Sequence, residues 1–428
     1  MIIAILVTFF TLLFLGMPIA FTIGLVSMGA LLFSGVSLEI LIQRMFAGVN
    51  NFSYLALPLF ILAGNIMGKG GLTKRLMALA DAIVGRFAGG LGMTAVVTSA
   101  FFGAVSGSTV ATTYAVGSVI VPRMKEQRYS NSFIASIIGP AGVLGLIIPP
   151  SITMVILGIT ANISIGKLFI AGFLPGLLLT IAFCIYVSYM SKKQGYGVVE
   201  TRKLSGKEFW KVCKEAFFPL MSPIFILGGI FSGLVTATEA AVIAVVYGFI
   251  LSLFYKELNM RVFKDIMANS AVTSAIILII ISFANAFTYV LTANRIPAMI
   301  SEFFLKMAHT PLQFLLIVSV ILLVLGTLTE VTSLIILLSP IFMPIALSYG
   351  IDPIHFGMVL IMNFALANIT PPVGLSLIAG CSITDRKMGI ENTFPYVLHV
   401  IGIVAFVVLI IIFVPSISTA LPNLFSKG

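Results

Sequence analysis

Long apolar stretches, separated by short polar or glycine-containing breaks, run along almost the whole chain. The stretch from Tyr396 to Val414 contains a single polar side chain, that of His399. About 20 such residues form a helix that crosses a bilayer core about 30 Å thick. The pattern therefore predicts an all-α polytopic membrane protein with ten crossings. These crossings are expected near residues 2–16, 18–35, 47–66, 132–159, 168–190, 217–235, 239–255, 270–293, 355–382 and 395–415.

Composition supports a chain that lies in lipid. Hydrophobic residues make up 60% of the 428 residues and charged residues 9%, whereas about a quarter of an average soluble domain is charged. The first apolar segment follows Met1 without a basic region or a small-residue cleavage site, so we expect a permanent span rather than a signal peptide. The three cysteines, Cys184, Cys213 and Cys381, are too widely spaced for a metal motif, and we expect them to be buried apolar side chains.

The distribution of basic residues predicts the orientation. With ten crossings, five of the 24 Lys and Arg residues fall on one face of the membrane and the other 19 (24 − 5) on the opposite face. The five are Arg44, Lys167, Arg295, Lys306 and Lys427. Cytoplasmic loops carry the excess of Lys and Arg, so the face with 19 is predicted to be cytoplasmic and both termini to lie outside. This bias also accounts for the net charge of +10.

Residues 191–216 are predicted to form a cytoplasmic amphipathic linker between two halves of the chain. Ser205 and Glu208 match a capping box, and Lys207, Lys211 and Lys214 fall largely opposite the apolar positions that follow. A helix lying on the membrane surface explains this pattern. A basic nucleic-acid patch is the less favoured alternative, because lysines commonly extend toward the headgroups at an interface.

An internal repeat is the most informative feature of the sequence. Pro149-Pro150 recurs as Pro371-Pro372 at an offset of 222 residues, and Gly158 matches Gly380 at the same offset. The repeats are predicted to span residues 1–190 and 217–428. Each contains five crossings, an odd number, so the second copy would enter the membrane upside down. Inverted repeats of this kind recur among secondary transporters.

Each repeat is predicted to contain one broken helix, at 132–159 and at 355–382. Because proline lacks an N–H group, the two pairs are expected to free the carbonyls of Gly145, Leu146, Ala367 and Asn368. Free carbonyls at membrane depth are tolerated where they line a cavity or bind a cation. Simple packing kinks remain the alternative.

Each repeat is also predicted to contain a re-entrant helical hairpin, at 91–122 and at 311–346. Polar residues interrupt these stretches at 106–109 and 326–333, which leaves arms of about 15 residues, or roughly 23 Å of helix. Such arms are too short to cross, so the polar tips are expected near the middle of the membrane. Hydroxyl and carbonyl oxygens there suit Na⁺ better than a transition metal.

Glu330 is the one acidic residue predicted at the middle of the membrane. An ionisable side chain at that depth is costly and usually functional. The possible roles are a cation ligand, a partner for a substrate hydroxyl, a proton site or a hydrogen-bonded structural acid. Glu239, by contrast, is expected to complete a capping box with Thr236.

Three motifs carry a resemblance to a known family. They are Gly16-Met17-Pro18-Ile19-Ala20-Phe21, Ile148-Pro149-Pro150-Ser151 and Ile369-Thr370-Pro371-Pro372-Val373-Gly374. Together they resemble the large membrane subunit (DctM type) of TRAP transporters, over nearly the whole chain. The resemblance implies an elevator-type carrier in the bacterial inner membrane, with a small membrane subunit (DctQ type) and an extracytoplasmic substrate-binding protein as partners. It also implies sodium-coupled uptake of carboxylates such as sialic acid or C4-dicarboxylates.

The resemblance further implies the site residues, with two or more Na⁺ as coupling ions. The first ion site would use Ser106, Ser108, Gly142 and Gly145, and the second Thr329, Thr332, Asn363 and Ala367. Substrate would lie between them, near Thr109, Ser151, Glu330 and Asn368.

Three other functions compete with this interpretation. A stand-alone sodium/dicarboxylate symporter would work without a binding protein. An intramembrane hydrolase is disfavoured, because the sequence has no His-Glu-x-x-His motif and no pair of acids deep in the spans. A passive channel would not need paired broken helices and hairpins.

Overall fold

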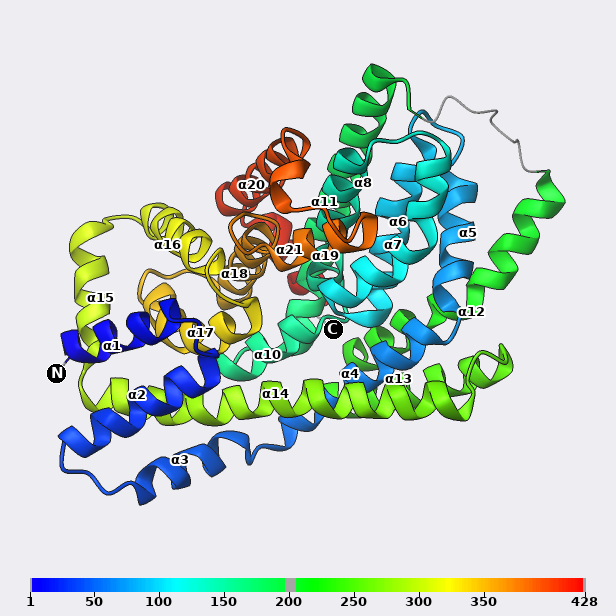
Figure 1. Ribbon diagram of the computed structural model, residues 1–428. Helices are drawn as coiled ribbons and strands as arrows, with labels where there is room; N and C mark the ends of the chain where they lie inside the picture. Colours follow the sequence, from blue (N-terminus) through cyan, green and yellow to red (C-terminus); the bar gives the residue numbers. More distant parts are fainter. Residues whose placement is uncertain (1, 197–204, 426–428) are drawn as a thin grey trace.

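The computed structural model describes residues 2–196 and 205–425, and within these ranges all regular structure is helical (Figure 1). The N-terminal elements are α1 (Ile2–Phe14), α2 (Ile19–Phe33), α3 (Glu39–Val49), a 3-10 helix (Phe52–Leu55), α4 (Ala56–Lys69) and α5 (Leu72–Val84). Between α1 and α2, Gly16 has a φ of +80° and Pro18 precedes the new helix. These two residues end one helix and start the next because glycine tolerates positive φ and proline cannot continue a helix.

The first repeat continues with helices that lie close together in space. They are α6 (Gly90–Ser106), α7 (Thr109–Glu126), α8 (Asn131–Ala141), α9 (Leu144–Ile147), α10 (Ile152–Thr160) and α11 (Ile165–Gln194). The helices α6 and α7 pack on one another as a hairpin. The helical path from α8 through α9 turns by 45° into α10 across the first proline pair.

The rest of the chain, predicted to be the second repeat, also contains a hairpin followed by an interrupted helix. It contains α12 (Gly206–Phe231), α13 (Ala237–Phe254), α14 (Met260–Ala293), α15 (Ile296–Met307), α16 (Pro311–Gly326), α17 (Val331–Ser348), α18 (Pro353–Ala367), α19 (Leu375–Thr384), a 3-10 helix (Ile390–Thr393), α20 (Tyr396–Phe413) and α21 (Ser416–Phe425). The hairpin α16–α17 and the interrupted pair α18 and α19 correspond to α6–α7 and α8–α10, although the four helices α12–α15 precede this hairpin and the five helices α1–α5 precede the first. The Pro149–Pro150 and Pro371–Pro372 peptide bonds are both cis.

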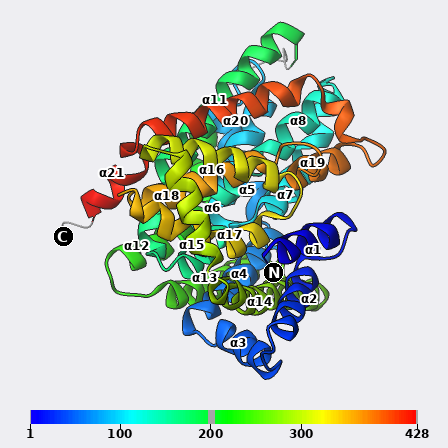
Figure 2. The ribbon, with the colours of Figure 1, turned by 90° about the vertical axis from the view of Figure 1, so that its left-hand side faces the viewer.

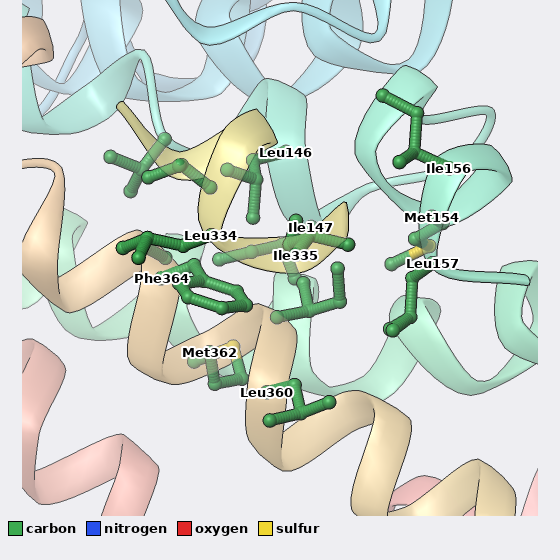
Figure 3. Close-up of a cluster of buried hydrophobic side chains, with 14 of the residues drawn as sticks. Leu146, Ile147, Met154, Ile156, Leu157, Leu334, Ile335, Leu360, Met362 and Phe364 are labelled. Carbon is green, nitrogen blue, oxygen red and sulfur yellow. The ribbon is translucent and has the colours of Figure 1, made fainter. Parts of the chain in front are cut away.

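The long helix α14 forms one edge of the molecule and packs against α2, α3 and α4 (Figure 1). At another edge α20 and α21 follow one another beside α11 (Figure 2). The two repeats meet between these edges. There α19 packs on α7 and α8, and α10 packs on α17. Figure 3 shows the apolar part of this contact, where Leu146 and Ile147 of α9 lie beside Leu334 and Ile335 of α17.

The helices differ in length from the predicted crossings. Within the described ranges, seven helices are long and apolar enough to cross a membrane, or nine if each of two bent pairs counts as one span. The sequence predicted ten. The expected crossings 2–16 and 18–35 correspond to α1 and α2, of 13 and 15 residues. The hairpin arms are longer than the predicted 15 residues. In the first hairpin α6 has 17 residues and α7 has 18, and in the second α16 has 16 and α17 has 18.

The linker also differs from the prediction. Ser205 and Glu208 do form the expected capping box, as do Thr236 and Glu239 at the start of α13. The residues that follow Ser205 are not a separate surface helix, however, because α12 runs unbroken from Gly206 to Phe231. Residues 197–204 of the linker lie outside the described residues, as does Lys427, one of the five basic residues predicted on the outer face. The cysteines are free; Cys381 is buried as predicted, whereas Cys184 and Cys213 are half-buried.

Candidate functional site: two hairpin turns against two proline breaks

The first hairpin turns within two residues, Gly107 and Ser108. Gly107 has a φ of +62°, which favours glycine, and Ser108 caps α7 by accepting a hydrogen bond from the Ala111 N–H (3.5 Å). The turn lies against the first proline break. The Ile152 N–H donates to the Gly107 carbonyl at 3.2 Å, and a Cβ added to Gly107 would lie 2.8 Å from the Pro150 carbonyl oxygen. Glycine is therefore needed for both the conformation and the close approach.

Three oxygen atoms gather just behind this turn. Ser106 Oγ lies 3.0 Å from Thr112 Oγ1, and Thr112 Oγ1 donates to the Ser108 carbonyl at 2.7 Å. Gly145 of α9 faces the same group, because a Cβ added to it would lie 2.7 Å from Thr112 Oγ1 and 2.9 Å from the Ser108 oxygen. Ser106, Thr112 and Gly145 are buried. The predicted residues Ser106, Ser108 and Gly145 are thus brought together, and Thr112 joins them.

The proline breaks leave fewer free carbonyls than predicted. Ser151 Oγ donates to the Leu146 carbonyl at 2.8 Å, so this carbonyl is not free. The N–H groups of Thr370 and Ser376 donate to the carbonyls of Ala367 and Asn368, both at 3.1 Å. The prediction is therefore wrong for three of the four carbonyls. Side chains and turn N–H groups replace the donors that proline lacks. The Gly145 carbonyl alone of the four accepts no hydrogen bond from any residue in 2–196 or 205–425.

At the next residue along α7, Thr113, a second polar group connects the two halves of the chain. A Cβ on Gly142 would meet the Thr113 hydroxyl and would lie 2.9 Å from the Thr109 carbonyl oxygen. Thr113 Oγ1 lies 3.3 Å from Ser376 Oγ of α19, which donates to the Gly139 carbonyl at 2.5 Å. Gly142 and Thr109 are therefore placed together, beside the oxygens behind the first turn.

Sequence reasoning missed Thr112, Thr113 and Ser376 as contributors. Thr112 and Thr113 lie close after the turn motif. Each stands four residues, about one helical turn, after Ser108 or Thr109, and this spacing is the sequence signal that could have identified them. Ser376 is separated from Thr113 by 263 residues, so no local pattern points to this pair.

The second hairpin keeps the same backbone contact with its proline break. The Val373 N–H donates to the Thr327 carbonyl at 3.3 Å, a bond like that from Ile152 to Gly107 in the first hairpin but displaced by one and two residues from the offset of 222. Ala367 occupies the position of Gly145 at the offset of 222, and its methyl group contacts Gly326 of α16. A small residue is again needed where the hairpin meets the helix.

Glu330 occupies the position of Ser108 at the same offset and caps α17. Its carboxylate accepts hydrogen bonds from the Ser333 N–H (3.1 Å), the Ser333 hydroxyl (3.3 Å) and the Thr332 hydroxyl. The side chain is exposed. A carboxylate at the first turn of a helix is favoured by the N–H groups there, so helix capping alone explains its presence, and any further role has to be tested.

The other predicted residues of the second ion site point in different directions. Asn363 is buried and donates to Ser319 Oγ (3.0 Å) and to its own helix at the Val359 carbonyl. Thr329 Oγ1 donates to the Leu325 carbonyl at 3.4 Å. Within the described part of the chain, no hydrogen bond joins Thr329 or Thr332 to Asn363 or Ala367.

The predicted substrate residues are likewise not joined to one another by hydrogen bonds in the ranges that the structure describes. Ser151 is buried and caps α10 by accepting from the Met154 N–H (3.4 Å). Asn368 Oδ1 accepts from the Ser376 N–H (3.3 Å), which ties the second break to α19. Both residues therefore hold the breaks in shape.

The oxygen atoms around the two hairpin turns belong to hydroxyl, amide and carbonyl groups and, at the second turn, to the Glu330 carboxylate. In the described residues no group of three or more His, Cys, Asp or Glu side chains could hold a metal ion. Hard oxygen donors without thiolate or imidazole suit alkali and alkaline-earth cations.

Comparison with known proteins gives the family context for these features. Residues 6–417 match the family model described as tripartite ATP-independent periplasmic transporter, DctM component. The C4-dicarboxylate TRAP transporter large permease DctM of Rhodobacter capsulatus is 37% identical, over 96% of each chain. The sialic acid TRAP transporter large permease SiaM of Vibrio cholerae is 34% identical, over 97% of this chain and 96% of that protein.

A third relative is longer than this chain. The isethionate TRAP transporter permease DctMQ of Oleidesulfovibrio alaskensis is 39% identical over 94% of this chain, but the match spans 63% of that protein. Among solved structures, the YdaH transporter of Alcanivorax borkumensis has a TM-score of 0.59 at 15% identity, covering 91% of this chain and 89% of that one. MtrF of Neisseria gonorrhoeae has a TM-score of 0.55 at 14% identity, with coverage of 89% and 85%. These structures share the fold.

Proposed function

Because the chain belongs to the DctM family, the large permease components of tripartite ATP-independent periplasmic transporters, we propose that it carries a small organic acid across the inner membrane by sodium symport. It is a transport protein rather than an enzyme. Its relatives are named for the transport of C4-dicarboxylates, sialic acid and isethionate, all organic anions. A substrate of the sialic acid or C4-dicarboxylate class is the proposal for this chain.

The oxygen atoms at the first hairpin turn carry the proposal of sodium coupling. Ser106 Oγ, Thr112 Oγ1 and the Ser108 carbonyl lie within hydrogen-bonding distance of one another, against the Cα of Gly145. Binding a monovalent cation to a neutral cluster of this kind has a lower desolvation cost than binding a divalent cation to a site with several carboxylates. We propose this cluster as the first Na⁺ site.

The second Na⁺ site is proposed at the Thr327–Glu330 turn. The backbone contact between Thr327 and Val373 supports it, because it repeats the contact found beside the first cluster. Glu330, Thr329 and Thr332 supply oxygens there, and substrate would lie between the two turns, near Ser151 and Asn368. We also propose that the hairpins and broken helices move together, as in an elevator-type carrier. The two halves are proposed to be inverted repeats, and both termini to lie outside the cytoplasm.

We also propose that the chain works with a small membrane subunit and an extracytoplasmic binding protein, rather than as a stand-alone symporter. The family match supports this dependence. The decisive experiment reconstitutes the chain with its small subunit in liposomes, adds the binding protein loaded with candidate acids, and imposes a sodium gradient. Uptake that needs both the gradient and the binding protein is expected. Uptake without the binding protein would favour the stand-alone symporter, and uptake without sodium would contradict the ion sites.

A further inference from the structure

A large apolar groove runs between α5, α6, α11 and α12, and its volume is about 1240 Å³. Ligand pockets of enzymes and receptors usually measure about 300–1,000 Å³ and carry several polar groups. The walls here are almost entirely apolar side chains, among them Phe87, Phe101, Leu177, Ile185 and Ile224. Leu177 and Ile185 are 56% and 65% exposed, so the groove is open along its length rather than sealed inside the protein.

One end of the groove carries positive charge. Lys192, in the last turn of α11, lines it, and the Arg86 guanidinium lies 5.2 Å from the centre of the Phe87 ring, which also lines it. Among the described residues neither Lys192 nor Arg86 forms a salt bridge. Two cations without carboxylate partners beside an apolar wall are complementary to a group with an anionic head and an apolar body.

The other end of the groove reaches the first proline break. Ile148 and Pro149 line it, and a Cβ on Gly176 of α11 would lie 2.5 Å from Ile148 Cγ1. Lys192 follows Gly176 by 16 residues (192 − 176), or about 24 Å of helix. Half the thickness of a bilayer with its headgroups is about 20–22 Å. A phospholipid with its phosphate at Lys192 would therefore end its acyl chains at Ile148 and Pro149.

From these features we infer that the groove binds one anionic phospholipid, with its headgroup at Lys192 and Arg86 and its acyl chains against the Ile148–Pro149 break. The lipid then forms part of the wall behind the first hairpin contact. Its occupancy connects the composition of the membrane to the packing of α9 and α10. This site does not depend on the proposed transport function, because its evidence is the shape, length and charge of the groove.

The headgroup is tested by binding to the purified, delipidated full-length chain. Phosphatidylglycerol is titrated into the protein, with phosphatidylcholine as the zwitterionic comparison, and bound lipid is counted by native mass spectrometry. We expect tighter binding of phosphatidylglycerol. The double substitution Arg86→Gln, Lys192→Gln should weaken it about fivefold per charge removed. Lys193→Gln is the matched control, because Lys193 is exposed and does not line the groove.

The acyl chains are tested by filling the groove. Gly228 of α12 lines it, and a Cβ there would have no atom within 4 Å, so Gly228→Phe should fill the space without distorting the backbone. Gly402→Phe on α20 is the control, since a Cβ there also meets no atom within 4 Å. Loss of lipid binding in Gly228→Phe but not in Gly402→Phe supports the site. Equal binding of the two lipids, or no effect of either groove change, would overturn it.

Discussion

The two hairpins make the same backbone contact with their proline breaks but surround it with different side chains. In the first, the turn is two residues long and buried hydroxyls of Ser106 and Thr112 fill the space behind it. In the second, the turn extends over Thr327–Glu330 and ends in an exposed carboxylate. Ser108 and Glu330 stand at equivalent positions, and each caps the second helix of its hairpin.

This difference distinguishes the backbone contact that both hairpins make from the side chains around it, which determine what each site can bind. In each half one backbone hydrogen bond, from Ile152 to Gly107 or from Val373 to Thr327, joins the hairpin turn to the proline break. The side chains around these two bonds are free to diverge. The first contact is lined by buried hydroxyl groups, whereas the second has an exposed carboxyl group. Four experiments test whether the two hairpin contacts differ in function.

The largest effect is expected from closing the space behind the first turn. Gly145→Ala places a methyl group 2.7 Å from Thr112 Oγ1. Overpacking of this kind costs about 1–3 kcal/mol, so sodium-driven uptake in liposomes should fall roughly 5- to 150-fold. The matched change in the second repeat, Ala367→Gly, removes a methyl group and should cost about 1 kcal/mol or less. Equal losses in the two variants would mean that the contacts are not specialised.

A smaller loss is expected from replacing the carboxylate of the second turn by the residue of the first. Glu330→Ser keeps a side chain that can cap α17 but removes the charge. If the carboxylate binds a cation or substrate, uptake should fall about tenfold, because for this exposed side chain we take the lower end, about 1.5 kcal/mol, of the usual value of a hydrogen bond to a charged group. Glu330→Ala, which also loses the cap, should in addition lower the thermal midpoint. Full activity of Glu330→Ser would show that Glu330 is only a helix cap.

Removing one hydroxyl from the first cluster should change sodium affinity specifically. Thr112→Val keeps the shape of the side chain and deletes an oxygen that lies 3.0 Å from Ser106 Oγ. The sodium concentration at half-maximal uptake should rise about three- to tenfold, since a single buried hydrogen bond contributes about 1 kcal/mol. Thr288→Val on α14 is the control, because that hydroxyl also donates to a carbonyl four residues earlier. An unchanged sodium dependence in Thr112→Val would exclude this oxygen as a ligand.

The smallest effect is expected at Ser108. Its carbonyl, rather than its side chain, faces Thr112, while its hydroxyl caps α7. Ser108→Ala should lower the free energy of unfolding by about 1 kcal/mol, and Ser108→Asn should restore it. Thermal unfolding of the purified variants measures both. A large shift in sodium affinity for Ser108→Ala that Ser108→Asn does not reverse would instead assign the hydroxyl to the ion site.

The sequence predicts the helix breaks well because their causes are local. Proline at 149, 150, 371 and 372 removes N–H groups whatever the surroundings, and the helices end at Ile147 and Ala367 as a result. The fate of the freed carbonyls depends on the conformation of the turns, which no local rule supplies. Ser151 and Ser376 therefore satisfied carbonyls that the sequence had suggested were free.

The remaining differences also have physical reasons. The helix α5 carries Lys74, Arg75 and Asp81, so it lacks the long apolar run from which the crossings were predicted. Pro219 and Pro223 suggest an end to the linker helix, yet α12 continues through both. The pairing of Thr113 with Ser376 joins residues 263 apart, and only the assembled repeats bring them together.

The polar seam between α7 and α19 has a consequence for how the chain is made. Besides Thr113 and Ser376, it pairs Tyr114 with Ser382 (2.9 Å) and the Lys125 ammonium with the Thr384 carbonyl (2.5 Å). At a synthesis rate of about 5–20 residues per second, α7 emerges on the order of 10–50 s before its partner. During that interval its hydroxyls face lipid, water or the insertion machinery. The N-terminal half is thus a ready target for quality control until the second half arrives, and truncation of the nascent chain before α19 would leave a fragment that the cell degrades.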